Sequence, residues 1–236
     1  MSAPRFWAVV PAAGIGRRMG GDTPKQYLPL LDATVIEYAL RPLLEHSAIQ
    51  QVVVVLAEND SYFHSLALAK HPKIQCVTGG AERADSVLAG LEVLLGLGAD
   101  EDIVLVHDAA RPCLTLGDID LLIEAIASSK DGVILAQPVV ETVKYSDAEG
   151  AIEQTLDRNY VYLAQTPQCF ALRALYEGYG RARDEAWVAT DEASIFEKMG
   201  RHPRLVKGAR RNIKITHPDD LALASFYLQE ENSLCE

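Results

Sequence analysis

Five short apolar runs, rich in β-branched residues, alternate with segments of helical period along the first part of the chain. The runs are 6–10, 52–57, 74–77, 103–106 and 133–136, and the helical segments between them are 34–47, 83–95 and 118–129. Strands that are apolar throughout are buried on both faces, and helices are the elements that cover such faces. The pattern therefore predicts an α/β fold, a Rossmann-like three-layer sandwich with a mostly parallel central sheet. Pro42 is expected to kink or shorten the first helix.

The rhythm changes between residues 139 and 162, where polar and apolar residues alternate with period two around a turn at 146–150. This predicts a protruding β-hairpin arm. An isolated hairpin is marginal in water, so we expect the arm to pack on another subunit; a flap on its own chain is the alternative. Helices are expected over 172–183 and 191–199, strands near 205–207 and 213–216, and a last helix after Pro218. No linker interrupts the chain, so residues 1–236 are interpreted as a single domain from which the arm is an excursion.

The first apolar run leads into a glycine-rich stretch. Residues 9–26 read VVPAAGIGRRMGGDTPKQ and bring Arg17, Arg18 and Lys25 close together in sequence. Glycines let backbone N–H groups approach phosphate oxygens, and Gly14 and Gly16 are the candidates for this role. The cations supply charge where a transferring phosphoryl group accumulates it. The stretch therefore predicts a nucleoside-triphosphate site.

Two commoner phosphate motifs do not match this stretch. A P-loop needs Lys and Ser or Thr after its last glycine, but Asp22 and Thr23 stand there. The dinucleotide motif needs an acid at the end of the second strand about 20 residues later, and Glu58 comes far too late. The remaining alternative is a strand-to-helix turn whose basic residues are only solvated.

A second group of polar residues ends the strand at 103–106. Ligands of parallel sheets bind at the carboxyl ends of the strands, so the loops beginning at Pro11, Thr78 and His107 should surround one crevice. Asp108 can hold Mg²⁺, a ribose hydroxyl or a substrate hydroxyl there; alternatively, Asp108 and Arg111 pair with each other. His107 is interpreted as a structural histidine.

Three further positions carry candidate chemistry. In the loop GGAERADS at 79–86, Ser86 offers a hydroxyl to a base edge, or the loop simply begins a helix with Arg83 and Asp85 in surface pairs. Thr190 opens a stretch typical of a helix N-cap. Lys214 is either an edge-strand gatekeeper or a cation that points into the crevice.

Composition limits the partners. The net charge of −11 argues against a nucleic-acid-coating surface, which needs clustered positive charge. The four cysteines are scattered without metal-ligand spacing, which indicates free thiols in a reducing compartment. There is no room for a signal peptide before the first strand and no apolar run of about 18 residues. We expect a soluble, cytoplasmic protein with no nucleic-acid or membrane partner.

Eight stretches carry a family resemblance, and they occur in order along nearly the whole chain. They are PAAGIGRRM (11–19), PKQY (24–27), GGAERADS (79–86), VHDAARP (106–112), DRN (157–159), TPQ (166–168), TDEAS (190–194) and NIKIT (212–216). With them, the sequence resembles the 2-C-methyl-D-erythritol 4-phosphate cytidylyltransferase family, which implies a nucleotidyltransferase-type fold.

The resemblance implies a Mg²⁺-dependent homodimeric enzyme that joins CTP to 2-C-methyl-D-erythritol 4-phosphate, with the arm reaching the neighbouring active site. It assigns transition-state stabilisation to Arg18 and Lys25, and the substrate phosphate to Arg158 and Lys214. Further residues follow from it as candidates. The cytosine pocket would comprise Ala12, Ala13, Gly80, Ala81 and Ser86; Thr142, Thr190 and Arg111 would contact the second substrate; and Asp108 would lie by the reacting groups, as the tentative metal ligand.

The sequence departs from the family pattern at one position, and it leaves alternative functions open. Some relatives carry Asp where this chain has Ala81, so a side-chain contact to the base is absent here. The nearest alternative function is a cytidylyltransferase for another alditol phosphate, such as ribitol 5-phosphate. A sugar-1-phosphate nucleotidyltransferase that uses UTP or GTP is the next, and a non-catalytic nucleotide sensor is a third.

Overall fold

The structure is a computed structural model that describes residues 4–14, 23–98 and 102–234. Two of the predicted site residues, Gly16 and Arg18, lie outside these ranges, as does Arg17.

A seven-stranded mixed sheet forms the centre of the molecule, with strand order β11-β7-β10-β6-β1-β4-β5. The strands are β1 (Phe6–Pro11), β4 (Ile49–Leu56), β5 (Ile74–Thr78), β6 (Ile103–Val106), β7 (Val133–Pro138), β10 (Tyr162–Ala171) and β11 (Arg204–Lys207). All neighbouring pairs are parallel except those of β10, which runs antiparallel to both β6 and β7. The five predicted apolar strands and the mostly parallel sheet are confirmed.

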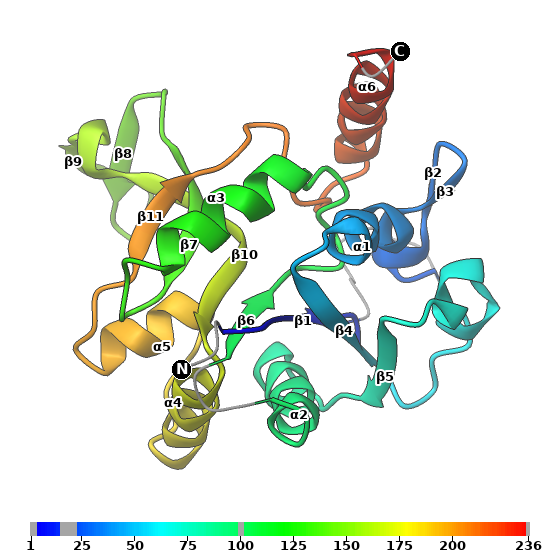
Figure 1. Cartoon of the computed structure of the whole chain (residues 1–236). Coiled ribbons are helices and arrows are strands. Elements are labelled where there is room, and N and C mark those ends of the chain that lie inside the picture. The colour runs from blue at the N-terminus through cyan, green and yellow to red at the C-terminus, as the bar shows by residue number, and fades with distance from the viewer. Residues whose placement is uncertain (1–3, 15–22, 99–101, 235–236) are drawn as a thin grey trace.

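Helices cover both faces of this sheet (Figure 1). They are α1 (Val35–Glu45), α2 (Arg83–Leu95), α3 (Leu116–Ile126), α4 (Leu172–Asp184), α5 (Glu192–Lys198) and α6 (Asp219–Leu234). Alternate residues of β1 separate the two cores: Ala8 and Val10 pack with α1 and α3, whereas Trp7 and Val9 pack with α2, α4 and α5. A strand that is apolar on both faces requires this three-layer arrangement. Within the described ranges, no helix has both the length and the apolar character that crossing a bilayer requires.

The first helix shows how local sequence sets an element's bounds. Thr34 and Glu37 form a capping box at the start of α1. Pro42 lies inside the helix, which continues only three residues further and ends at Glu45, two residues before the predicted end. Before it lie the short strands β2 (Pro29–Leu30) and β3 (Ala33–Thr34) and the 3₁₀ helix η2 (Lys25–Tyr27); the other 3₁₀ helices are η3 (Phe63–Ser65), η4 (Ala67–Lys70) and η5 (Arg158–Tyr160).

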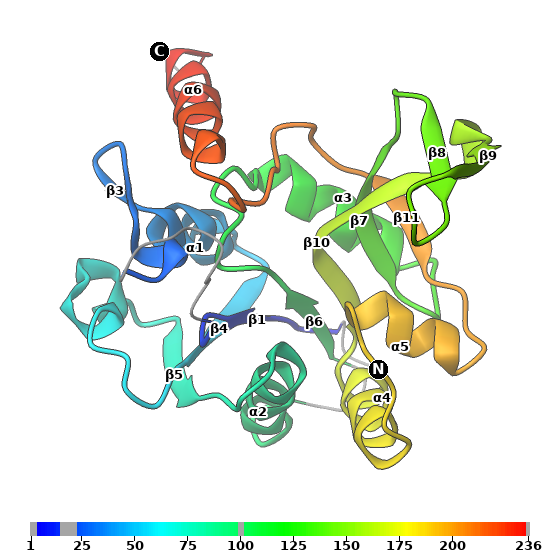
Figure 2. The ribbon, with the colours of Figure 1, turned by 180° about the vertical axis from the view of Figure 1, so that it is seen from behind.

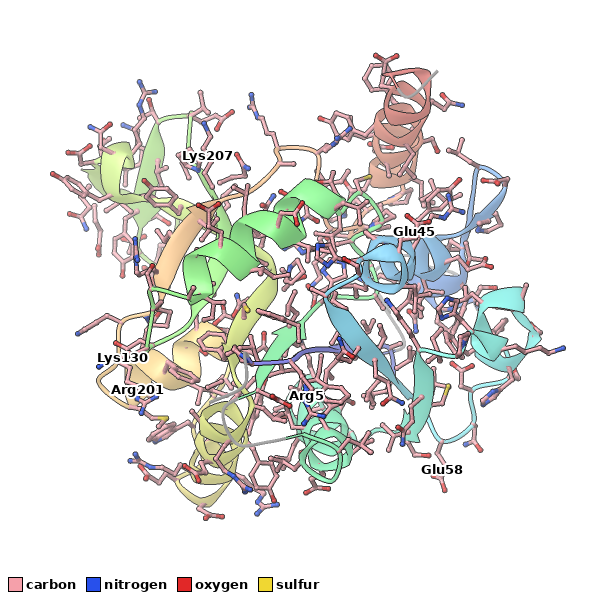
Figure 3. All side chains as sticks on the ribbon, in the orientation of Figure 1. Arg5, Glu45, Glu58, Lys130, Arg201 and Lys207 are labelled. Atoms are coloured by element: carbon pink, nitrogen blue, oxygen red, sulfur yellow. The ribbon has the colours of Figure 1, made fainter. Side chains whose placement is uncertain are left out.

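The predicted arm is a two-stranded hairpin of β8 (Val143–Ser146) and β9 (Ile152–Leu156) that projects from the body between β7 and β10 (Figures 1 and 2). Gly150 makes the turn with φ of +86°. Large apolar side chains on the arm and at its base are exposed, among them Ile152 at 65% and Tyr160 at 84%. In Figure 3 the side chains of β8 and β9 stand away from the covering helices.

One strand of the sheet was not predicted, and one predicted strand is absent. Strand β10 was not predicted, because its buried residues Gln165, Thr166 and Gln168 are polar and hide it from an apolar pattern. The strand expected at 213–216 is absent, since this segment forms no ladder with the sheet.

Candidate active site

A cavity of about 290 Å³ opens at the carboxyl ends of β1, β5 and β6. Its walls come from the three loops that the strand-end rule brings together, from η2 and from Lys214. The lining residues are Pro11, Ala12, Ala13, Gly14, Lys25, Gln26, Gly80, Ala81, Glu82, Arg83, Ser86, Asp108, Ala109, Ala110 and Lys214. The predicted crevice is therefore present. All the predicted nucleotide-binding residues that the structure describes line it.

The glycine-rich loop is anchored by a residue to which the sequence analysis gave no role. Gln26 is buried, and its amide nitrogen donates hydrogen bonds to the carbonyls of Ala12 (2.7 Å) and Gly14 (3.1 Å). Tyr27 follows on the same 3₁₀ helix and donates to Asp60 at 2.6 Å. The PKQY motif thus holds the floor of the cavity while Lys25 lines it and donates to the Ile215 carbonyl at 2.8 Å.

The second wall needs glycine for steric reasons. A Cβ on Gly80 would lie 2.3 Å from Cβ of Asp85, a distance no real pair adopts. Asp85 accepts from the backbone of Glu82 in a capping box at the start of α2 and forms no ion pair with a residue that the structure describes. Ser86 is buried and donates to the Glu82 carbonyl at 3.2 Å.

Asp108 lies at the centre of a cluster of three cations. Its carboxylate is 2.8 Å from Nζ of Lys214, 3.3 Å from Nε of Arg83 and 3.6 Å from Nε of Arg111. Burial alone raises the pKa of Asp108, but the charges of Arg83, Lys214 and Arg111 lower it well below its usual range. The carboxylate is therefore ionised at neutral pH. The expected pair with Arg111 exists, but Lys214 is the closer partner, and Arg83 points inward instead of forming a surface pair.

Lys214 lies on an extended segment that is held by two side chains and a backbone hydrogen bond. Arg111 donates to the Asn212 carbonyl at 2.8 Å, Gln165 donates to the same carbonyl at 3.1 Å, and the Ile215 N–H donates to Ala110 at 2.8 Å. Lys214 therefore points into the crevice, and its interpretation as an edge-strand gatekeeper is wrong. Arg111, a substrate-binding candidate, uses Nη1 to hold this segment, while its Nη2 donates to the Ala164 carbonyl at 3.3 Å.

His107 is fully buried behind Asp108, as expected of a structural histidine. Its Nδ1 lies 3.1 Å from Oγ1 of Thr166 and its Nε2 lies 3.2 Å from the Arg111 carbonyl. Burial lowers the pKa of His107 to about 4, so the ring is neutral at physiological pH. The Thr166 hydroxyl also accepts from the Asp108 N–H at 3.0 Å. The ring thus connects the carboxyl end of β6 to β10.

Two further cavities adjoin the first. One of about 310 Å³ shares Arg83, Asp108 and Lys214 with it and is also lined by Arg111 and Thr190. The other, of about 330 Å³, shares Arg111 and Lys214 with the second cavity and reaches the base of the arm at residues 138–141. The Asp108 cluster therefore lies on the wall between the first cavity and the second.

The structure does not bring the remaining arm candidates to this cluster. Thr142 and Arg158 are exposed on the arm, and Arg158 donates to the carbonyl of Val140. Neither residue lines any of the three cavities within this chain.

The side chains around the cavity offer Mg²⁺ one protein ligand. Among the described residues there is no group of three or more His, Cys, Asp or Glu side chains that could hold a metal ion. Mg²⁺ usually keeps several waters and takes one or two carboxylates together with substrate phosphates. The ionised carboxylate of Asp108 on the cavity wall fits one such ligand.

Comparisons with known proteins agree over nearly the whole chain. The family model described as 2-C-methyl-D-erythritol 4-phosphate cytidylyltransferase matches residues 6–230. Proteins of that name from Tolumonas auensis and Vibrio vulnificus CMCP6 are each 50% identical, covering 96% and 95% of this chain and 97% and 94% of their own. The solved structure of the Francisella tularensis protein of that name is 35% identical with a TM-score of 0.81, and the match covers 94% of this chain and 99% of that one.

Proposed function

Because this chain belongs to the 2-C-methyl-D-erythritol 4-phosphate cytidylyltransferase family, it transfers CMP from CTP to 2-C-methyl-D-erythritol 4-phosphate, and we propose how its residues divide that reaction. The products are 4-diphosphocytidyl-2-C-methyl-D-erythritol and pyrophosphate, in the non-mevalonate route to isoprenoid precursors. The observation that supports the division is the Asp108 cluster, which separates two adjoining cavities at the carboxyl edge of the sheet.

The cavity of about 290 Å³ is proposed to bind CTP. Backbone groups at 12–14 and 80–81, together with Ser86, face the nucleotide, and Gly16 and Arg18 extend the phosphate-binding part by family analogy. Glycine and alanine suit this wall because a larger side chain at Gly80 would collide with α2. Ala81 offers no side-chain contact to the base, so backbone groups and Ser86 are left to select cytosine.

The second substrate is proposed to bind in the adjoining cavity lined by Arg111, Thr190 and Lys214. An oxygen of its phosphate forms the new bond to the α-phosphorus of CTP, while the bond from that phosphorus to the bridging oxygen breaks and pyrophosphate leaves. The attacking oxygen is already an anion, so no general base is needed. Alignment and neutralisation of two anions are the main tasks, and Arg18, Lys25 and Lys214 are proposed to perform them.

A bound Mg²⁺, held largely by CTP phosphate oxygens with Asp108 as a protein ligand, would add positive charge to the triphosphate. Asp108 has a second role that depends on the chain alone. Its carboxylate holds the Lys214 ammonium at 2.8 Å on the wall shared by the two cavities.

We assign Thr142 and Arg158 to the site of a partner subunit in a homodimer. Both residues lie on the exposed arm away from the cavities of their own chain, and exposed apolar side chains such as Ile152 give the arm a surface to bury. Co-expression of Lys25→Ala and Arg158→Ala chains tests this assignment. At an acceptor concentration too low for either variant alone to be active, mixed dimers would contain one complete site, so activity should return to about one quarter of the wild-type value; an arm acting on its own chain would restore none.

The reaction itself is tested by pyrophosphate release. CTP should be used in preference to UTP and GTP, and 2-C-methyl-D-erythritol 4-phosphate in preference to ribitol 5-phosphate. Equal use of ribitol 5-phosphate would contradict the acceptor assignment. A cytoplasmic location, a single catalytic domain over 1–236 and the lack of nucleic-acid or membrane partners stay proposals, supported by the net charge of −11 and the scattered cysteines.

A further inference from the structure

Glu192, the first residue of α5, is a completely buried carboxylate next to the site. Its Oε1 accepts from Nη1 of Arg83 at 2.7 Å and from the Tyr179 hydroxyl at 2.7 Å, and its Oε2 accepts from Nη2 of Arg83 at 3.2 Å. The arrangement is a bidentate, charge-assisted pair. It joins α2, α4 and α5 at one point.

Helix capping does not explain this residue. The N-cap of α5 is Asp191, which accepts from the Ser194 N–H at 2.9 Å. Stability is also a weak explanation, because replacing a buried ion pair by apolar residues of similar volume is often neutral or stabilising. The remaining explanation for the buried carboxylate is that it orients Arg83.

Arg83 connects Glu192 to the reacting region. While its two terminal nitrogens face Glu192, its Nε faces Oδ1 of Asp108 at 3.3 Å, and the other oxygen of Asp108 holds Lys214 at 2.8 Å. Arg83 also lines both the nucleotide cavity and the adjoining one. If the carboxylate of Glu192 were lost, the Arg83 guanidinium could turn to Asp108 and compete with Lys214 for it.

We propose that Glu192 is a positioning residue, which fixes Arg83 against Asp108 and so keeps Asp108 available to orient Lys214 between the two substrates. The inference rests on the proposed function of this site. A displacement of about 1 Å in such an array can lower turnover by about a hundredfold. The loss should appear in the transition state and leave the binding of CTP nearly intact.

Glu192→Gln keeps the shape of the side chain and removes its charge. We expect kcat and kcat/KM in pyrophosphate release to fall together by about tenfold to a hundredfold, with the Kd of CTP measured by calorimetry within about twofold of wild type. Glu185→Gln is the matched control, since Glu185 forms an exposed pair with Arg181 at 3.2 Å on α4, and it should leave both quantities unchanged.

Normal kcat in folded Glu192→Gln, with only a lower melting temperature, would reduce Glu192 to a structural residue and overturn the proposal. A wild-type enzyme that releases no pyrophosphate would instead contradict the proposed function.

A comparison of Arg83→Met with a double variant covers the case in which Glu192→Gln does not fold. The Arg83→Met, Glu192→Met chain replaces the pair by apolar residues of similar length. If Glu192 acts through Arg83, the double variant and Arg83→Met should lose kcat by the same factor. A larger loss in the double variant would show that Glu192 acts independently, and a double variant with wild-type kcat would show that the pair does not position the site.

Discussion

Gln26→Met provides a test of how the glycine-rich loop is prepared for CTP. Methionine is close to glutamine in length and apolar, so the main change is the loss of the amide that donates to the carbonyls of Ala12 and Gly14. These carbonyls are at the start of the loop that lines the nucleotide cavity. The variant therefore removes two restraints on the loop and leaves the cations in place.

The size of the effect follows from the two bonds. Each net hydrogen bond contributes about 1 kcal/mol, and a buried carbonyl without a donor costs about 1–3 kcal/mol. The Ala12 carbonyl belongs to a residue only 3% exposed, so it is the one that stays unsatisfied. If the variant must order the loop when CTP binds, the free energy of binding becomes less favourable by about 2 kcal/mol in total. This corresponds to roughly a thirtyfold change in affinity.

We expect calorimetry to show the Kd of CTP raised about tenfold to thirtyfold, while kcat at saturating CTP changes by less than about threefold. Such a pattern means that the lost interaction acts equally in the ground state and in the transition state. Gln50→Met is the control, because the Gln50 amide is exposed and donates to the carbonyl of Ala48, two residues away. A folded Gln26→Met enzyme with wild-type CTP affinity would refute the reasoning.

Three other outcomes are expected. Lys25→Ala should lower kcat by about a hundredfold or more, because it removes a cation from the triphosphate; near-normal single-turnover rates in a folded variant would remove Lys25 from the mechanism. Arg158→Ala should weaken the use of the acceptor phosphate, seen as a higher KM for that substrate, and leave the calorimetric Kd of CTP unchanged; a weakened CTP complex would contradict its assignment to the second substrate. Burial lowers the pKa of His107 to about 4 from its ordinary value of 6.5. Between pH 6.5 and 4, His107 is therefore protonated in the unfolded chain and neutral in the folded chain. The free energy of unfolding should fall by about 3 kcal/mol more in the wild type than in His107→Asn over that window, measured by urea titration, and parallel curves would show that the ring titrates normally.

Sequence patterns predicted the elements that apolar packing determines. The strands β1, β4, β5, β6 and β7 each contain a run of mostly apolar residues, and they were placed to within a few residues. The segment 213–216 has alternating Ile213 and Ile215, which is typical of a strand. In place of a ladder, its Ile215 carbonyl accepts from Nζ of Lys25, and Arg111 and Gln165 hold the carbonyl of Asn212 just before it. Such remote side-chain partners leave no trace in a local pattern.

In the site, too, the sequence predicted the features set by topology and missed those set by contacts between distant residues. The strand-end rule located the loops around Asp108, because that rule depends only on topology. The roles of Glu192 and Gln26 were missed, although their motifs were noted, since Glu192 meets Arg83 across 109 positions of sequence. One signal was available: Asp191 is sufficient to cap α5, so the acid beside it had no local partner.

Strand β10 connects the arm, the second cavity and Glu192 structurally. It runs back antiparallel to β7, and the arm is the excursion between the two strands. Its middle places Thr166 against the Asp108 N–H and Gln165 against the segment that carries Lys214. Its buried Gln168 then accepts from the Ala193 N–H at 3.0 Å and donates to Asp191 at 2.9 Å, which fixes the start of α5 where Glu192 meets Arg83. A parallel, apolar strand in this position would fill the sheet equally well, but it could not supply these polar contacts, so the polarity that hid β10 from the sequence is what connects it to the site.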